Sequence, residues 1–598
     1  MAGKKDKQLK EGYLADYISG KEVRDTPEER QAVQILSRIL AEDYDYPKDH
    51  IQTHPQWRVK VCPSDRNKNY PVDIAVFSSS DKTEDATLIL CECKKKNRKD
   101  GRGQLEDYLT FSKARIGIWY NAKDVLYLLK TEKNGQVIFS EIPNIPRHGQ
   151  RVEDIGKFKR CDLKPASNLK TIFKSIRNYL AANAVGITRD EVFAQQLINL
   201  IFCIIYDERF TKKQDVVRFR AGIGEAPGDV NKRIVDLFKQ VKEQYSDVIE
   251  ISDRISLDEK SLIYVVGQLE NYCLIDCERD AVGEAFEVFI GPAIKGPQGQ
   301  FFTPRNVVKM VVDIVDPSPD STILDPACGS GGFLVEALRH VWKKVERRGK
   351  QYGWPEAEIA AEKQRVAIKN FRGIDKDTFL SKVAKAYMAI LGDGRGGVFC
   401  ENSLDKNNNW HVEAKKSVPF EAFDIVITNP PFGKKLAIDS EEMLKTFDLG
   451  HIWKLNEKNE FEKGELQDSQ TPQLLFIERC LDFLKPGGKL GIVLLESIFG
   501  MPKYSYVVDY IIRNTTILGI ITLPEDLFQP HTHAKTCVLI CEKTIQDKSH
   551  DIFMCDVKWC GHDSRGNPTF TINKKGERVL LDDVPNVATL FHKGSGKK

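Results

Sequence analysis

An Asn-Pro-Pro-Phe sequence, Asn429 to Phe432, ends a short apolar run that begins at Phe423. Two successive prolines fix an extended turn, because each restricts its own backbone and that of the residue before it. The side-chain carbonyl of Asn429 and the main-chain carbonyl of Pro430 could then accept both hydrogens of one amino group. The Phe432 ring could stack on a base carrying that group, with Pro431 holding the turn rigid. This chemistry suits methylation of an exocyclic amine such as adenine N6, whose delocalised lone pair makes it a poor nucleophile.

A glycine-rich turn lies upstream, in Asp325-Pro-Ala-Cys-Gly-Ser-Gly-Gly-Phe333. It follows the apolar run 322–324 and precedes a predicted helix over 334–345. Such a turn lets a ligand approach the backbone next to a helix N-terminus. Glycine turns serve dinucleotides and other nucleoside cofactors, and a plain strand-to-helix connection is the structural alternative. Together with the Asn-Pro-Pro-Phe turn, the pattern favours a nucleoside methyl donor.

A second set of chemical groups lies near the N-terminus. Asp73 stands within an expected strand over 72–77, and Glu92 and Lys94 end the next one. Alternation along a strand puts Glu92 and Lys94 on one face. Asp73 and Glu92 could hold Mg²⁺ for hydrolysis of a phosphodiester, while Lys94 steadies the attacking hydroxide. Charged strand ends without any catalytic role show the same bare spacing.

Two neighbouring helices could add to this group. One begins at Glu28 and Glu29, either of which could supply a further carboxylate. The other carries Gln104 and Tyr108, four residues apart and therefore on one face.

The elements that must position these residues fall into four regions. A helix and then strands are expected over 27–150, with helical periodicity over 170–275. From about 300 to 545, short apolar runs alternate with helical stretches, which is typical of a doubly wound, mainly parallel sheet of the Rossmann-like α/β class. The last fifty residues are rich in turns. We therefore predict domains over 1–165, 166–285, 286–548 and 549–598.

Composition excludes several classes of protein. The 598 residues are too many for one compact core, and 41% hydrophobic with 29% charged residues is typical of globular protein. No apolar run of bilayer length occurs, so we expect no membrane association. The 14 scattered cysteines favour a reducing, cytoplasmic location. A net charge of +3 says little about partners, and the basic runs at 94–99 and 343–348 could equally be solvated faces.

From about 170 to 570 the sequence resembles the modification subunits of type I restriction–modification systems. The motifs that carry the resemblance are Gln300-Phe-Phe-Thr-Pro-Arg305, Asp325 to Phe333, Asn429 to Phe432, Leu484-Lys-Pro-Gly-Gly488, and Leu523-Pro through Lys535-Thr536. The resemblance implies a site-specific adenine-N6 DNA methyltransferase that uses S-adenosylmethionine. The implied cofactor-binding residues are Gln300, Phe301, Thr303, Pro304, Asp325, Cys328, Gly329, Ser330, Gly331, Asp375 and Asn402.

Within that set, Asp375 stands where the family holds the ribose hydroxyls. Asn402 stands where the family usually has an acid that contacts the cofactor adenine, so this contact is open. A second departure is Leu-Leu-Glu-Ser after Val493, in place of the commoner Leu-Pro-Asp-Gly.

The N-terminal order of a Glu helix, Asp73, Glu92-x-Lys94 and a Gln-x-x-x-Tyr helix resembles the nuclease domain of type I restriction subunits, with its PD-(D/E)xK fold. The resemblance implies a Mg²⁺-dependent endonuclease, with Glu29 and Gln104 as further candidate residues. The whole chain looks similar to type IIB restriction–modification enzymes. It is expected to act on double-stranded DNA in a hetero-oligomer with a separate specificity subunit.

Three other interpretations stay open. The nuclease-like domain could only bind DNA or regulate a modification-only subunit. The Asn-Pro-Pro turn could serve protein glutamine amides or small molecules, or cytosine N4. The chain could also be a DNA-binding scaffold without enzymatic activity.

Overall fold

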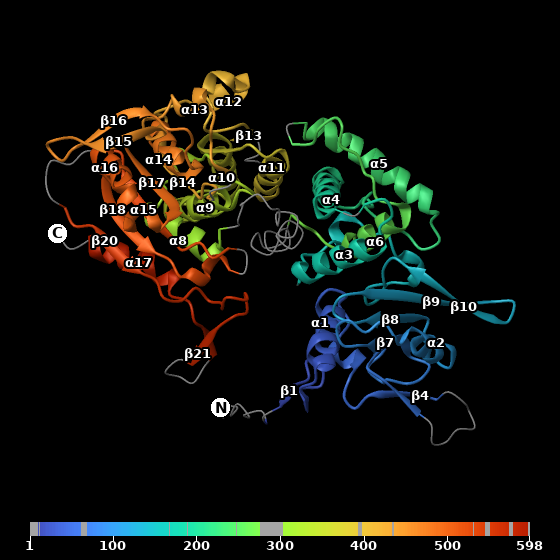
Figure 1. Ribbon diagram of the computed structural model, residues 1–598. Coiled ribbons are helices and arrows are strands. Elements are labelled where there is room, and N and C mark those ends of the chain that lie inside the picture. Colours follow the sequence, from blue (N-terminus) through green and yellow to red (C-terminus); the bar gives the residue numbers. More distant parts are fainter. Residues whose placement is uncertain are drawn as a thin grey trace. The chain divides into compact units, whose positions relative to one another are not determined.

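The computed structural model divides into two compact units, Met1–Ala293 and Ile294–Lys598 (Figure 1). Each unit is described by itself. The residues that the structure describes are 10, 12–60, 69–166, 168–187, 189–246, 248–275, 303–392, 397–432, 436–529, 532–544, 550–572 and 578–595.

The first unit contains a six-stranded sheet in the order β10-β9-β8-β7-β6-β3. Its strands are β3 (Ile51–Gln52), β6 (Ile74–Phe77), β7 (Thr87–Cys93), β8 (Ile116–Tyr120), β9 (Val125–Lys133) and β10 (Gln136–Ile142). Strands β7 and β8 run parallel and are connected through helix α2 (Arg102–Thr110), whereas the other neighbouring pairs are antiparallel.

Two helices cover opposite faces of this sheet. Alternation along β7 directs Ile89 and Cys91 into one hydrophobic cluster, shared with α1 (Gln34–Glu42). The residue between them, Leu90, faces the cluster that α2 contributes to. The expected strand over 72–77 is interrupted at Asp73. Its first part is β5 (Asn69–Val72), which pairs with β4 (Trp57–Lys60), while β6 pairs with β7.

The described part of the expected helical region, up to residue 275, contains four helices and belongs to the first unit. They are α3 (Leu169–Asn183), α4 (Asp190–Phe210), α5 (Pro227–Gln244) and α6 (Glu259–Leu269). A short hairpin of β1 (Tyr13–Ala15) and β2 (Glu22–Arg24) precedes the large sheet. Most of α4 is buried among its neighbours. Even so, none of the helices in the described ranges has the length and apolar character needed to cross a bilayer.

The second unit is built on an eight-stranded sheet in the order β13-β12-β11-β14-β17-β19-β18-β20. Its strands are β11 (Ile323–Asp325), β12 (Phe371–Asp375), β13 (Val398–Cys400), β14 (Phe423–Thr428), β17 (Leu484–Leu495), β18 (Thr516–Thr522), β19 (Thr536–Glu542) and β20 (Phe553–Asp556). Strand β19 runs antiparallel to both of its neighbours, and the other paired strands of the sheet are parallel.

Helices pack on both faces of this sheet, which confirms the predicted doubly wound architecture (Figure 1). The helices are α8 (Arg305–Val315), α9 (Gly332–Tyr352), α10 (Glu356–Asn370), α11 (Thr378–Gly392), α12 (Val412–Ser417), α13 (Glu441–Leu444), α14 (Pro472–Phe483), α15 (Ser497–Gly500), α16 (Ser505–Asn514) and α17 (Val584–Ser595). Helices α12, α14 and α16 share a core with alternate residues of the central strands. Helix α8 packs on the other face, where Val311 and Val315 lie close to Gly491 of β17.

The chain order places β11 at a switch point, because β12 and β14 lie on either side of it. In open α/β sheets, ligands bind outside the carboxyl ends of the strands at such a point. The glycine turn follows β11, and Asn429 follows β14. Both predicted motifs therefore lie at the edge where the fold itself favours a ligand.

The last fifty residues were expected to form an appended module. Instead, β20 pairs in parallel with β18 and becomes the last strand of the large sheet. Helix α17 packs against α8 and β20. The sheet therefore extends past the domain boundary expected at residue 548, because β20, which follows that residue, pairs with the edge of β18. In the sequence, the hairpin of β21 (Phe570–Ile572) and β22 (Arg578–Leu580) falls between β20 and α17. A second hairpin is formed by β15 (His451–Leu455) and β16 (Phe461–Leu466).

Candidate active sites

A cavity of about 380 Å³ opens at the carboxyl ends of β11, β12, β13 and β14. The predicted residues in its lining are Thr303, Asp325, Cys328, Gly329, Ser330, Asp375, Asn402, Asn429, Pro430, Pro431 and Phe432. The structure thus brings the proposed cofactor residues and the Asn-Pro-Pro-Phe turn to one cavity. Pro304 and Gly331 do not line the cavity. They are the residues directly before α8 and α9. Gln300 and Phe301 lie outside the described residues.

The glycine turn is held by a hydrogen bond from a neighbouring strand end. The backbone N–H of Gly329 donates to Oδ2 of Asp375 over 2.9 Å. Gly331 has φ +87°, and a Cβ there would stand 3.2 Å from Cβ of Ala384, so a larger residue would be strained and crowded. At Gly329, whose φ is +52°, and at Gly332, no described residue beyond the adjacent backbone would lie within 4 Å of an added Cβ. This part of the wall is open to a ligand.

Two carboxyl groups approach the cavity from adjacent strands. Burial raises the pKa of Asp325, at the end of β11, to about 7. Burial also raises the pKa of Asp375, although backbone N–H groups of Asp377 and Gly329 donate to its two oxygens and oppose that shift. Acceptor-rich strand ends of this kind suit a ligand with hydroxyl groups or positive charge.

Glu401 is a lining carboxylate that the motif comparison did not single out. It follows β13 and precedes Asn402. Its Oε1 accepts a hydrogen bond from the His411 backbone N–H and lies 2.8 Å from Nδ1 of the same residue. Oδ1 of Asn402 accepts from the backbone N–H of Leu404 at 3.2 Å. The sequence signal that could have identified Glu401 is its position directly after a short apolar run.

The two ends of the Asn429 carboxamide have different hydrogen-bonding surroundings. Its Nδ2 donates a hydrogen bond to Oγ1 of Thr303 over 2.9 Å. Its Oδ1 is buried, and no donor among the described residues reaches it. A buried carbonyl without a donor is costly, so this oxygen is suited to receive one from a ligand.

The aromatic part of the turn packs against a later segment. The ring of Phe432 meets that of Phe528 edge-to-face, with centroids 5.7 Å apart and planes at 76°. Phe528 belongs to the Leu523-to-Thr536 motif, whose contribution to the base site was not predicted. An edge-to-face partner of this kind restricts the orientation of the Phe432 ring.

In the first unit, Asp73, Glu92 and Lys94 gather where β5 and β6 meet and where β7 ends. Oδ2 of Asp73 accepts from the backbone N–H of Cys93 at 2.7 Å, and Lys94 Nζ forms an ion pair with Glu92 Oε1. Burial raises the pKa of Asp73 to about 6, and burial followed by the charge of Asp73 raises the pKa of Glu92 to about 7. Two mutually repelling, buried carboxyls favour a cation between them.

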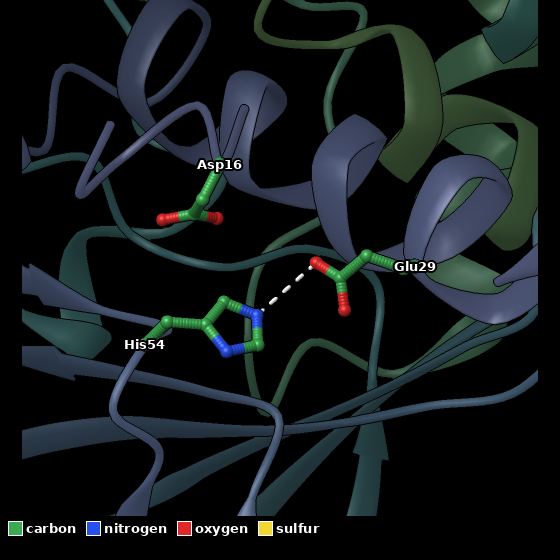
Figure 2. Close-up of side chains that lie close together, drawn as sticks. All are labelled: Asp16, Glu29 and His54. Carbon is green, nitrogen blue, oxygen red and sulfur yellow. Dashed lines mark hydrogen bonds and ion pairs between the residues drawn. The ribbon is translucent and has the colours of Figure 1, made fainter. Parts of the chain in front are cut away.

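The two neighbouring glutamates, Glu28 and Glu29, have different surroundings. The charge of Glu28 contributes to the raised pKa values of both Asp73 and Glu92. The charge of Glu29 contributes to the raised pKa of Asp73, and its Oε1 lies 3.2 Å from Nε2 of His54 (Figure 2). Because Oε1 of Glu29 already contacts Gln34 and His54, Glu28 is the candidate that we prefer to the Glu29 of the motif comparison.

Glu29 belongs to a separate cluster with Asp16 and His54. One carboxylate oxygen or ring nitrogen from each residue could ligate a metal ion, and these atoms lie within 4.8 Å of one another (Figure 2). The oxygens of Asp16 accept hydrogen bonds from Gln34 and from groups of Ser19 and Thr53. Gln34 Nε2 also donates to Glu29 Oε1 at 2.7 Å. Through these hydrogen bonds the cluster connects the N-terminal hairpin, the first helix and the turn at His54.

Gln104 and Tyr108 lie on the side of the site that α2 forms. Gln104 Nε2 donates to the Tyr108 hydroxyl, and that hydroxyl donates to the Pro71 carbonyl at 2.9 Å. Gly101 also lies at this site, although the sequence analysis did not single it out. Its φ of +105° favours glycine, and an added Cβ would stand 2.7 Å from Cε of Lys94, so the end of the lysine side chain would have to shift.

Two family descriptions match separate parts of the chain. Residues 277–574 match N-6 DNA Methylase, and residues 27–146 match the type I restriction enzyme R protein N terminus.

Among curated relatives, the EcoEI type I methylase subunit of Escherichia coli is 23% identical over 431 residues, covering 68% of this chain and 75% of that protein. The type II restriction enzyme and methyltransferase RM.BcgI of Heyndrickxia coagulans is 22% identical, covering 45% of this chain and 35% of that protein. The chain spans about half the length of several other type I methylase subunits that it matches.

A solved type I methyltransferase subunit from Streptococcus thermophilus aligns over 72% of this chain and 92% of its own, with 17% identity and a TM-score of 0.44. The match to the N-6 DNA Methylase family covers residues 277–574, about half of this chain.

Proposed function

We propose that this chain is a DNA methyltransferase that transfers a methyl group from S-adenosylmethionine to adenine N6, fused to a Mg²⁺-dependent DNA endonuclease. It would act in a restriction–modification complex with a separate specificity subunit. The buried Oδ1 of Asn429, which lines the cavity and lacks a donor among the described residues, carries the methyltransferase part of the proposal.

The cavity fits a nucleoside methyl donor on its own chemistry. The glycine turn leaves open space at Gly329 and Gly332, and the acceptors of Asp375 and Glu401 lie at successive strand ends. Asp375 would hold the ribose hydroxyls, and Asn402 or Glu401 would contact the adenine of the donor. When bound, S-adenosylmethionine supplies an electrophilic methyl group on a sulfonium.

The residues of the catalytic turn would prepare the nucleophile. Oδ1 of Asn429 and the carbonyl of Pro430 would each accept a hydrogen from the target amine, which shifts its nitrogen lone pair out of conjugation. Phe432 would stack on the base after it leaves the duplex. Stacking on an aromatic ring contributes about 1–3 kcal/mol per base.

For the nuclease part, the paired carboxyls of Asp73 and Glu92 support the proposal. They would hold Mg²⁺, with Lys94 stabilising negative charge at the scissile phosphate. Glu28 would complete the negative potential of this site. The match of residues 27–146 to a restriction-subunit N terminus agrees with this role.

The specificity partner is proposed from the relatives. Type I methylase subunits are named as subunits, and RM.BcgI is named as both restriction enzyme and methyltransferase. A partner that reads bases in the groove would leave this chain to supply the two chemistries. The domain roles proposed are nuclease over 1–165, a helical domain over 166–285 and methyl transfer over 286–548. Segment 549–598 would contribute a strand and a docking surface.

The test is nucleoside mass spectrometry of DNA from cells that co-express this chain with its candidate specificity partner. N6-methyladenine is expected with the wild type and should disappear with Asn429→Ala. The matched control is Glu92→Gln, which should retain the methylated base because Glu92 belongs to the other unit.

Three other results would each change the proposal. N4-methylcytosine in place of N6-methyladenine would keep the fold and change the substrate. Methylated glutamine in protein, with unmodified DNA, would replace DNA as the substrate. Restriction that persists in Glu92→Ala would support the modification-only alternative.

A further inference from the structure

Thr303 and Asn429 come from distant parts of the sequence and meet at the cavity. Thr303 directly precedes Pro304, the residue before α8, and Asn429 directly follows β14. Nδ2 of Asn429 donates to Oγ1 of Thr303 over 2.9 Å. The sequence comparison assigned Thr303 only to the cofactor, so this bond adds a contact to the catalytic side chain.

Both residues are attached to the rigid part of the second unit. The backbone N–H groups of Val307 and Val308 each donate to the Pro304 carbonyl at 3.0 Å, which fixes the first turn of α8. Thr428, the last residue of β14, pairs with Ile492 of β17. The bond between Thr303 and Asn429 therefore connects two backbone segments that have little freedom to move apart.

The orientation of the Asn429 amide decides which end meets the ligand. With Nδ2 directed to Thr303, Oδ1 is the end left without a donor, and it is buried. A rotated amide would present its N–H₂ group to an amine, which places two donors against each other. A hydroxyl that accepts from Nδ2 and an amine that donates to Oδ1 favour the same orientation.

We infer that Thr303 is a positioning residue for methyl transfer, which holds the Asn429 carboxamide with Oδ1 toward the target amine. The inference rests on the proposed function for the identity of that amine, but the hydrogen bond itself does not. Thr303 would then have two tasks, because a hydroxyl whose oxygen accepts from Asn429 can still donate its proton to the cofactor side of the cavity.

Two variants separate the hydroxyl from the shape of the side chain. Thr303→Val removes the acceptor and keeps the branched shape, whereas Thr303→Ser keeps the hydroxyl. We expect kcat for methyl transfer by the full chain with its specificity partner to fall about five- to tenfold in Thr303→Val. KM for DNA and Kd for S-adenosylmethionine should change less than twofold, and Thr303→Ser should restore most of kcat.

A second measurement does not depend on activity. In crystal structures of the full chain, the Asn429 side chain should keep one orientation in the wild type and in Thr303→Ser. In Thr303→Val it should rotate or occupy two orientations.

The results distinguish the two proposals. An Asn429 side chain unchanged in Thr303→Val, with unchanged kcat, would overturn the positioning role. A loss confined to cofactor affinity would assign Thr303 to the cofactor alone and also overturn it. Rotation of Asn429 in Thr303→Val, in a wild-type protein that methylates no DNA, would retain the positioning role and reject the proposed function.

Discussion

Gly329 and Asp375 are joined by a hydrogen bond in which the glycine N–H donates to the carboxylate Oδ2 over 2.9 Å. The bond connects the turn after β11 to the end of β12. The same carboxylate is the candidate acceptor for the ribose hydroxyls of a nucleoside cofactor. One side chain thus shapes the glycine turn and completes the cofactor pocket.

Replacing Asp375 should therefore affect cofactor binding more than folding. Asp375→Ala removes both functions, and we expect S-adenosylmethionine to bind about ten- to a hundredfold more weakly, because hydrogen bonds to charged groups contribute about 1.5–3 kcal/mol each. Asp375→Asn retains an acceptor for Gly329 and should lose less. Isothermal titration calorimetry on the full chain measures both, and equal affinity in all three proteins would reject the assignment.

Phe432 should act on the target base and leave the cofactor site unaffected. Phe432→Ala removes the stacking ring, and we expect kcat for methyl transfer to fall about tenfold or more. Phe432→Trp keeps an aromatic face and should retain most of the rate. Steady-state kinetics with a cognate duplex measures the change, with cofactor affinity as the internal control. A similar loss in both variants would mean that Phe432 serves only to pack against Phe528.

Cleavage should depend on Glu28 and Glu92 but not on Glu29. We expect Mg²⁺-dependent cutting of unmethylated plasmid to be abolished in Glu92→Gln and strongly reduced in Glu28→Gln. Glu29→Gln is the matched control, since Glu29 bonds to His54 and Gln34 instead. Removal of the metal with a chelator should stop cutting in every protein. Cutting lost in Glu29→Gln and kept in Glu28→Gln would reverse the assignment.

The two parts of the methyltransferase site differed in how far sequence could predict them. The strand ends at Asp325 and Asp375 were predictable, because short apolar runs directly precede both residues. The bond between Thr303 and Asn429 was not, since it depends on how α8 lies on the sheet. Phe528 escaped prediction for the same reason, because the packing of the buried end of the short helix Glu525–Phe528 depends on tertiary contacts.

The N-terminal unit shows a second limit of sequence patterns. Spacing placed Glu92 and Lys94 on one face of an expected strand, and they do form an ion pair, with Lys94 directly after the last residue of β7. It could not choose between Glu28 and Glu29, since adjacent residues at a helix start point in different directions. That direction depends on the short helical segment Glu29–Val33, whose wider turn precedes α1.

Glu270 gives a prediction for stability in the first unit. Burial raises its pKa from 4.5 to about 8, while its Oε2 accepts from the Ala221 backbone N–H at 2.6 Å. Because the folded state holds this proton more tightly than the unfolded state, the contribution of Glu270 to stability is greatest below pH 4.5 and is lost as pH rises through about 8. Glu270→Gln keeps the acceptor and cannot ionise.

Calorimetry of the full chain should therefore show a lower unfolding temperature for the first unit at about pH 8 than at about pH 5.5 in the wild type, and a smaller difference in Glu270→Gln. The variant should be the more stable protein at the higher pH, since it avoids a buried charge there. Parallel pH dependence in the two proteins would mean that Glu270 stays in one protonation state across this range, with Arg220 and Arg233 supplying enough positive charge to keep it ionised.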